Sequence, residues 1–419
     1  MAEKFYLCID LKSFFASVEC VERGLDPFTT NLVVADPSRG NGAICLAITP
    51  AMKALGIKNR CRVFEIPKSV EYITALPHMK RYMEVSADIY SVYLDYISPD
   101  DIHVYSIDEC FIDITQYLKM YGKTPREMAV MLIDAVFEKT GICAAAGIGT
   151  NLFLAKVALD ITAKHTDNHI GYLDENEFQK TIWTHRPITD IWNIGKGIAK
   201  RLEKYGVSDL KGITELPPKL LYKEFGINAE NIINHANGIE RCTISDIKNY
   251  KPKSSSLSHS QILFEDYKYD DAFLVLKEMV DKQVLELVEK KLVADSISLY
   301  IGYSKDVIHS TGGTRKIGEF TNSYKKLMGH FESLFKETTV KGYPIRKIGI
   351  GLNNLEDDSM SSITLFTDIE AEEKERKLQQ AIISIKNKHG KNAVLKGISY
   401  TEKGTARVRN KLIGGHNGE

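Results

Sequence analysis

The spacing of apolar residues predicts the elements of the first part of the chain. A short apolar run at residues 4–11 (KFYLCIDL) is typical of a buried strand, although Asp10 interrupts it. Between residues 102 and 114, two apolar segments flank a short polar connection, as in two strands joined by a tight turn. Further strand or helix patterns occupy residues 32–35, 43–48, 50–56, 80–96, 124–139, 143–149 and 151–162. This alternation of strands and helices indicates an α/β sheet backed by helices.

The second part of the chain follows a different pattern. Residues 188–202 predict a short helix, a glycine-flanked hairpin and the start of another helix. Residues 248–258 (KNYKPKSSSLS) are polar and basic, which favours a linker. Six segments after it predict a β-α-β-β-α-β unit, and they are 258–264, 270–293, 296–303, 311–320, 324–335 and 345–352. A charged helix is expected over 369–388, and the basic segment 396–415 is expected to be only partly ordered.

Composition and charge fit a protein of several domains. A chain of 419 residues is too long for one small domain. Its apolar share of 43% and charged share of 26% are ordinary for a folded protein. The 55 basic and 55 acidic residues cancel, but acidic residues dominate 1–250, and basic residues dominate 251–350 and 386–419. Such segregation suits a protein that concentrates metal ions in one region and meets a polyanion in another.

The cysteines and the apolar runs limit the cell compartments in which we expect the protein. The seven cysteines show no C-x-x-C spacing and their number is odd, which argues against a zinc site or a disulfide framework. Such cysteine usage fits a reducing cytoplasm. No apolar run approaches the roughly 20 residues that span a bilayer, and the N-terminus lacks a signal-peptide pattern. We therefore expect a cytoplasmic protein that does not enter a membrane.

Three acidic residues interrupt the apolar segments. Asp10 lies in the first predicted strand, and Asp108 and Glu109 lie at the later turn. Adjacent carboxylates between apolar strands repel each other and lose hydration unless a cation neutralises them. An acidic turn by itself is more often exposed surface. A third carboxylate on a matching strand favours a metal site made by all three residues.

Other candidate residues keep two interpretations each. Phe14 and Phe15, at a predicted helix start, are core residues or part of a site beside the first acid. Ser13 is a plausible cap of that helix, whose first backbone amides can hold phosphate. The backbone around Gly195 and Gly197 can approach sugar-phosphate closely, although a plain helical hairpin has the same pattern. Four basic residues either follow a nucleic-acid backbone or protect strand edges from aggregation, and they are Arg315, Lys316, Arg346 and Lys347.

Three strings of the sequence resemble those of Y-family (DinB/UmuC-type) translesion DNA polymerases. They are CIDLKSFFASVE at 8–19, YSIDECFID at 105–113, and AGIGTN at 146–151 with LAK at 154–156. The resemblance extends from residue 4 to residue 352 and is closest in character to UmuC-like proteins of Gram-positive bacteria. It implies an α+β multidomain fold shaped as a right hand, with palm, fingers, a helix-hairpin-helix thumb and a β-α-β-β-α-β little finger. The implied bounds are 1–12 and 80–170 for the palm, 13–79 for the fingers, 171–241 for the thumb, 242–251 for a linker, 252–352 for the little finger, and 353–419 for a clamp-binding and basic C-terminal tail.

The same resemblance implies a DNA-directed DNA polymerase that copies damaged templates with low fidelity, as in the SOS response. Asp10, Asp108 and Glu109 would be catalytic and would hold two Mg²⁺ ions, with the Leu11 carbonyl as a further ligand. Phe15 would be the steric gate that excludes ribonucleotides. Contacts to the incoming deoxynucleoside triphosphate are implied for Ser13, Phe14, Lys53 and Lys164.

The implied partners are primer-template DNA, a deoxynucleoside triphosphate and a sliding clamp, for a monomeric chain without membrane contact. DNA contacts are implied for Gly195, Gly197, Arg315, Lys316, Arg346 and Lys347. The segment SITLF at 362–366 resembles the clamp-binding peptide, which is usually Gln-Leu-x-Leu-Phe, and its apolar contacts would be Ile363, Leu365 and Phe366. Ser362 replaces the usual glutamine and would lack its anchoring hydrogen bond.

Two other functions fit part of the sequence. A catalytically silent protein that binds DNA or the clamp would use the same downstream domains, but the intact acid trio argues against it. A nucleotidyl cyclase would share paired acids on a palm-like fold, but it would not explain the thumb hairpin or the little finger. Primer extension with Mg²⁺ and deoxynucleotides distinguishes these functions from a polymerase.

Overall fold

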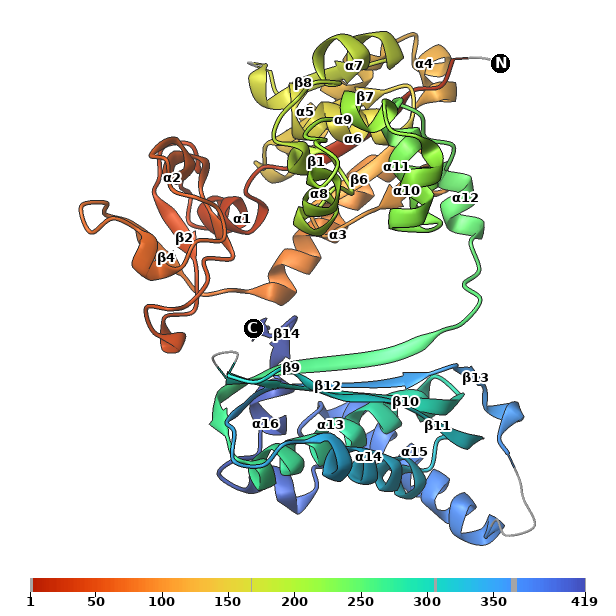
Figure 1. Cartoon of the computed structure of the whole chain (residues 1–419). Coiled ribbons are helices and arrows are strands. Elements are labelled where there is room, and N and C mark those ends of the chain that lie inside the picture. The colour runs from red at the N-terminus through yellow and green to blue at the C-terminus, as the bar shows by residue number, and fades with distance from the viewer. Residues whose placement is uncertain (1–2, 167, 305–306, 363–367, 419) are drawn as a thin grey trace. The chain divides into compact units, whose positions relative to one another are not determined.

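The computed structural model describes residues 3–166, 168–304, 307–362 and 368–418. These residues divide into two compact units. Unit 1 extends to Tyr250 and also includes Asn417 and Gly418, and unit 2 is Lys251–His416. Figure 1 labels the helices and strands along the chain. Within the described ranges, no helix is long and apolar enough to cross a membrane.

A five-stranded sheet forms the centre of unit 1, in the order β5-β6-β1-β7-β8. Its strands are β1 (Tyr6–Leu11), β5 (Ile102–Val104), β6 (Glu109–Asp113), β7 (Ala144–Gly149) and β8 (Ile170–Leu173). β1 runs antiparallel to β6 and β7, whereas β7 and β8 are parallel. The first apolar run of the chain is therefore the central strand. The expected pair of strands around residue 106 is confirmed, although Glu109 begins β6 rather than lying in the turn.

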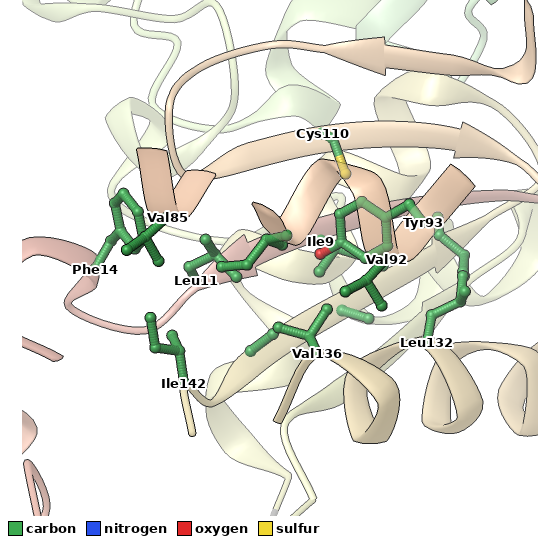
Figure 2. Packing of buried hydrophobic residues seen from close by; sticks show 14 of the residues in the cluster. Ile9, Leu11, Phe14, Val85, Val92, Tyr93, Cys110, Leu132, Val136 and Ile142 are labelled. Atoms are coloured by element: carbon green, nitrogen blue, oxygen red, sulfur yellow. The ribbon is translucent and has the colours of Figure 1, made fainter. Parts of the chain in front are cut away.

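Helices cover both faces of this sheet. They are α3 (Met79–Leu94), α5 (Pro125–Thr140) and α6 (Leu152–Asp160). Ile9 and Leu11 of β1 belong to one core cluster with residues of α3 and α5, which Figure 2 shows. Tyr6 and Cys8 pack with α6 on the opposite face. Because successive residues of a strand point to opposite faces, Asp10 shares the α6 face with Cys8.

Glycines in β7 let α6 approach the sheet closely. A Cβ on Gly147 would lie 2.1 Å from the Ala155 oxygen, and one on Gly149 would lie 2.2 Å from the Ala155 nitrogen. A larger residue at either position would push the helix away from the strand. The short separation brings Lys156, the next residue of α6, to the sheet beside β1, where it is buried.

The remaining elements of unit 1 flank the central sheet. A smaller sheet has the order β3-β2-β4. This part contains α1 (Phe14–Glu22), β2 (Leu32–Val34), β3 (Ala47–Ile48), α2 (Pro50–Ala54) and β4 (Ile73–Ala75). The other helices are α4 (Thr115–Tyr121), α7 (Glu175–Thr181), α8 (Lys196–Glu203), α9 (Leu210–Thr214), α10 (Pro218–Phe225), α11 (Asn228–Ala236) and α12 (Ile244–Asn249). The expected linker 242–251 thus contains α12, whose Ile244 packs in the core of unit 1.

Unit 2 is built on a four-stranded path, β11-β10-β12-β9. Its main elements are β9 (Ser256–Tyr267), α13 (Tyr269–Glu289), β10 (Leu292–Tyr303), β11 (Thr311–Thr321), α14 (Tyr324–Thr338) and β12 (Ile345–Asn353). The expected β-α-β-β-α-β order is therefore confirmed. Alternate residues of β10, such as Ile297 and Leu299, are buried in one core with residues of α13 and α14. Tyr300 points to the other face and is 43% exposed.

The chain after β12 adds further elements to unit 2. They are β13 (Glu356–Asp357), η7 (Asp358–Met360), α15 (Ile369–His389), η8 (Gly397–Tyr400), α16 (Ala406–Arg409) and β14 (Leu412–Ile413), and β15 (His416–Asn417) follows. The charged helix expected over 369–388 is confirmed. The prediction of partial order is wrong for residues 397–409, because η8 and α16 pack on α13 and Thr405 is fully buried there.

Candidate active site

The structure brings the three predicted acids to one end of β1. In the register of β1 and β6, Asp10 lies directly opposite Glu109. The Leu11 amide donates a hydrogen bond of 2.9 Å to the Asp108 carbonyl, which fixes the residue before Glu109 beside the same strand end. Strand pairing between segments about 100 residues apart thus creates the cluster, which no local pattern specifies.

The turn that carries Asp108 is held by hydrogen bonds from its own residues and from α3. Ser106 Oγ donates to Asp108 Oδ1 at 2.7 Å, and the Ser106 amide donates to the Glu109 carbonyl at 3.0 Å. Ser86 Oγ of α3 donates to the Ile107 carbonyl at 2.6 Å. These bonds set the turn conformation before any ligand binds.

Glu109 has two partners on the α6 face of the sheet. Lys156 Nζ lies 2.8 Å from Glu109 Oε1 and 3.0 Å from Asp160 Oδ1. Cys8 Sγ donates to the same Oε1 at 3.0 Å. Both contacts orient the carboxylate through one oxygen, and neither contact uses Oε2. The sequence indicated Lys156 only as part of a family string and gave no signal for its pairing with Glu109.

Burial and mutual repulsion both act on the acid trio. Burial first, and then the negative charges of Asp108 and Glu109, raise the pKa of Asp10 to about 7. Throughout the described ranges, no three His, Cys, Asp or Glu side chains are gathered closely enough to hold a metal ion. The backbone thus aligns the three acids, while their side chains do not converge on one point.

Phe15 and Tyr82 form a stacked aromatic pair next to this cluster. Their ring centroids lie 4.5 Å apart at an interplanar angle of 14°. Tyr82 donates its hydroxyl proton to Glu19 Oε1 at 2.6 Å, and His78 Nδ1 lies 2.7 Å from the same oxygen. Glu19 is fully buried and also pairs with Arg23. The Phe15 ring is thus supported by a hydrogen-bonded network that joins α1 to α3, and the sequence gave no indication of Tyr82.

Ser13 has a strained backbone immediately before α1. Its φ of 50° lies in the left-handed region, which non-glycine residues rarely adopt. The expectation that its side chain caps α1 is wrong, because Ser13 Oγ makes no cap hydrogen bond and is buried without a partner. Phe14 follows it with its side chain in the core. The first amides of α1 have no intrahelical acceptor and are available to a ligand.

Lys53 lies within electrostatic reach of both Lys164 and Lys12. Burial and the charge of Lys164 lower the pKa of Lys53, and Asp10 opposes this shift. Burial and the charge of Lys53 lower the pKa of Lys12 to about 8, although Cys143 and Asp10 oppose this. The structure thus brings together the predicted Lys53 and Lys164 and adds Lys12, which is adjacent in sequence to Leu11.

The glycine-flanked hairpin predicted for DNA contact precedes α8. Gly195 is the N-cap of that helix, and Gly197 is its second residue. A Cβ on either glycine would meet no described atom within 4 Å, so both lie against open space. The adjacent Trp192 donates its indole proton to the Tyr105 hydroxyl at 3.1 Å, which connects this hairpin to the segment before the acidic turn.

The four basic residues of unit 2 do not form the expected stripe on adjacent strands. β10 separates β11 from β12, and Arg315 lies on the helix-covered face, where it pairs with Glu337 of α14. Lys316 lies on the opposite face of β11 by alternation. Lys347 of β12 also lies on the open face, with its ammonium 5.1 Å from the Tyr300 ring centre. Arg346 lies 3.7 Å from Asp266 in an ion pair.

The predicted clamp-binding residues Ile363, Leu365 and Phe366 lie outside the described residues. The described residue before them, Ser362, is attached to β11. Its amide donates to the Phe320 carbonyl at 2.9 Å, and its Oγ accepts from the Phe320 amide at 2.9 Å. Ser362, which replaces the usual glutamine, is therefore already engaged within unit 2.

Comparison with known proteins extends across both units. The model of the impB/mucB/samB family matches residues 9–160, and the model of that family's C-terminal domain matches residues 254–365. DNA polymerase IV 2 of Bacillus subtilis (strain 168) is 32% identical, with 99% of each chain covered. DNA polymerase IV 2 of Halalkalibacterium halodurans is 28% identical, also with 99% of each chain covered.

One solved structure extends the comparison to the fold. The Y-family DNA polymerase chimera Dbh-Dpo4(243-245)-Dbh matches with a TM-score of 0.65 and 22% identity, covering 84% of this chain and 98% of its own. That match shows a shared α+β architecture of palm, fingers, thumb and little finger. Both family matches and a relative of more than 30% identity across nearly the whole chain show that the protein belongs to the impB/mucB/samB family, the Y-family of DNA polymerases, in the form found in Gram-positive bacteria.

Proposed function

We propose that this protein extends DNA primers across damaged templates by nucleotidyl transfer, with Asp10, Asp108 and Glu109 as its catalytic residues. One observation supports this most: strand pairing brings three carboxylates to one end of β1, where burial and the charges of Asp108 and Glu109 raise the pKa of Asp10. A fold gains nothing in stability from such repulsion, so a cation-dependent function is the physical reason to keep it.

The donor set fits hard divalent cations. Three carboxylates and the Leu11 carbonyl offer only oxygen ligands, which Mg²⁺ prefers. Cys8 does not change this, because burial and the Glu109 charge raise the pKa of its thiol far above the usual value and keep it protonated. We infer that the site takes two Mg²⁺ ions. Held by Asp10, Asp108 and Glu109, they would supply Lewis-acid activation of the primer 3′-hydroxyl and charge stabilisation of the pyrophosphate leaving group.

The chain's own residues select and hold the nucleotide. Phe15, fixed by its stacking on Tyr82, is proposed to fill the space that a ribonucleotide 2′-hydroxyl would need. Lys53 and Lys164, together with Lys12, supply positive charge for the triphosphate. The backbone amides of Ser13 and Phe14 at the start of α1 supply hydrogen bonds to its oxygens.

DNA and clamp contacts complete the proposal. The open backbone at Gly195 and Gly197 is proposed to contact sugar-phosphate of the template duplex. Lys316 and Lys347 on the open face of the unit 2 sheet are proposed to contact the phosphate backbone. The segment 362–366 is proposed to bind a sliding clamp. We do not include Arg315 among the proposed DNA contacts, because it forms an ion pair with Glu337.

A primer-extension assay with Mg²⁺ and deoxynucleotides tests the proposed function. Wild type should extend a primer on an undamaged template and past a template lesion. Asp108→Ala should reduce the rate of extension by about 10²–10³-fold, as when a group that stabilises the transition state is lost. Asp100→Ala removes an exposed acid from the short helix that precedes β5; it is the control and should keep wild-type rates.

Two outcomes would contradict the proposal in different ways. If wild type shows no extension with any divalent cation, the protein is a silent DNA-binding or clamp-binding member of the family. If wild type extends primers and Asp108→Ala extends them equally well, the protein is a polymerase whose catalytic site is elsewhere.

A further inference from the structure

A cavity of about 380 Å³ lies within unit 2, between α13, α15 and the C-terminal segment 391–410. It is on the helix-covered side of the sheet and contains none of the residues discussed above for DNA or nucleotide binding. Six Lys and Arg side chains line it. Two of them, Lys290 and Lys396, form ion pairs. We call the other four the cation cluster: Lys282, Lys386, Lys391 and Arg409. They come from α13, from α15 and from the segment after it, so the cavity exists only because the C-terminal segment folds onto α13.

The cation cluster lacks carboxylate partners. Within the part of the chain that the structure describes, none of its four members has a carboxylate oxygen within 4.0 Å. Lys386 Nζ donates instead to the Lys391 carbonyl at 2.8 Å, and Arg409 Nη1 donates to the Gln261 amide oxygen at 3.0 Å. Arg409 Nε is buried without any partner. Arg409 Nη2 donates to the Glu278 carbonyl at 3.4 Å. The buried Nε proton is costly without an acceptor and could donate to an oxygen of a ligand.

The acidic residues that line the cavity are already engaged. Glu286 pairs with His259 and Lys290, and Asp281 pairs with Lys396. Glu289 accepts a hydrogen bond from Asn387. Glu278 Oε2 accepts from the amides of Thr405 and Ala406 at 2.8 and 3.1 Å, although its Oε1 has no partner. The lining as a whole holds six Lys and Arg side chains against four Asp and Glu side chains, so positive charge is in excess.

The pKa shifts of two lysines agree with this excess of positive charge. Burial first, and then the charges of Arg409 and Lys391, lower the pKa of Lys282, although Glu286 opposes this shift. Burial also lowers the pKa of Lys386, and Asp281 opposes it. An anion that binds among these cations would offset their mutual repulsion.

We propose that this cavity is a binding site for a small phosphate-bearing anion. A phosphate group offers several acceptor oxygens, which suits a guanidinium together with several ammonium groups. The apolar side chains of Leu285, Ile383 and Leu395 line the same cavity and give room for an organic part of the ligand. A DNA duplex is excluded by the size of the cavity. The site does not depend on the proposed catalysis.

Isothermal titration calorimetry on the full chain tests this proposal. Inorganic phosphate and adenosine monophosphate are the probes, and EDTA keeps divalent cations from attracting them to the acid trio. Wild type should bind one equivalent. The double variant Lys282→Gln, Lys391→Gln should bind at least about tenfold more weakly, the change expected when one or more charge-assisted hydrogen bonds are lost. Lys268→Gln, Lys374→Gln, with the same charge change at exposed positions of unit 2, should bind as wild type does.

The possible outcomes distinguish between the candidate ligands and show whether the proposed site exists. Tighter binding of adenosine monophosphate than of phosphate would assign a nucleotide, and equal binding would assign free phosphate. No saturable binding, or equal loss in both double variants, would overturn the site. Displacement of the probe by primer-template DNA would also overturn it, because the cations would then be part of the DNA surface. Circular dichroism melting verifies that each variant is folded, and Arg409→Gln provides a second test of the same cavity.

Discussion

Phe15 is the single residue on which sugar selection should depend. Its ring stacks on Tyr82. Phe15 makes none of the hydrogen bonds that hold the acidic turn, so we expect its removal to open space and leave that turn in place. We expect Phe15→Ala to lower discrimination against ribonucleotides by about 10–200-fold, the range for a group the size of a methylene. The ratio of steady-state kcat/KM values for matched deoxynucleotides and ribonucleotides measures this discrimination. Phe28→Ala, at an exposed phenylalanine, is the control. Unchanged discrimination in Phe15→Ala would remove the steric-gate assignment.

Lys156 should determine the orientation of Glu109. Its ammonium lies 2.8 Å from one Glu109 oxygen, and both side chains are nearly buried. Lys156→Met should lower kcat by about 10–100-fold, because the uncompensated carboxylate turns away from its working orientation. Lys156→Arg should recover part of the rate. Single-turnover extension at saturating nucleotide measures the effect, and melting curves exclude unfolding. Equal rates for the Met and Arg variants would show that charge at this position has no positioning function.

At the scale of elements, Glu19 joins α1 to α3. Burial alone would raise its pKa, but hydrogen bonds from Tyr82, His78 and Arg23 outweigh burial and lower it. Because the pKa of Glu19 is lower in the folded protein than in the unfolded chain, its ionised carboxylate stabilises the fold. This stabilisation is fully present above the unfolded pKa of about 4.3 and is lost as the pH falls through the folded pKa. We therefore expect Glu19→Gln to cost about 1–3 kcal/mol at pH 7 and much less near pH 3.

Urea unfolding of both proteins at pH 7 and at low pH measures this difference. Glu22→Gln is the matched control, because Glu22 is on the same helix but pairs with Arg81 at the surface. Its cost should stay within about 1 kcal/mol at either pH. A destabilisation by Glu19→Gln that is the same at both pH values would show that packing, and not the carboxylate charge, joins the two helices.

At the scale of the whole molecule, the proposed catalytic acids and the proposed DNA-binding lysines belong to different units. The acid trio belongs to unit 1, whereas Lys316 and Lys347 lie on the open sheet face of unit 2. Lys316→Ala, Lys347→Ala should weaken primer-template binding and reduce the salt slope of log Kd by about 1 per lost phosphate contact. The single-turnover rate at saturating DNA should not change. Fluorescence anisotropy across salt concentrations measures the slope.

Arg315→Ala is the informative control for that double variant. Because Arg315 is engaged by Glu337 on the helix-covered face, its loss should leave the salt slope at the wild-type value. A slope that falls equally in both variants would mean that Arg315 leaves its ion pair when DNA binds. The helix-covered face would then have to be included in the DNA surface.

The sequence by itself determined most of the elements and predicted the acid trio. Strand and helix periodicities predicted β1, α5 and the whole β-α-β-β-α-β order, because local alternation and helical spacing carry that information. Family strings predicted that Asp10, Asp108 and Glu109 form one site. The register of β1 and β6 is compatible with this, since it sets Asp10 opposite Glu109.

Only the tertiary structure decided which side chains meet. The pairing of Lys156 with Glu109, the stacking of Tyr82 on Phe15, and the cation cluster on α13 all join segments distant in sequence. The strand order was also decided by the tertiary structure. β10 lies between β11 and β12, so the basic residues of β11 and β12 do not form the expected stripe on adjacent strands. The periodicity of apolar residues indicates which face of a segment is buried and which is exposed to water, and that is a local property. Contact between side chains depends on strand order and on which face of a sheet a helix covers, and neither is recorded in the spacing of apolar residues.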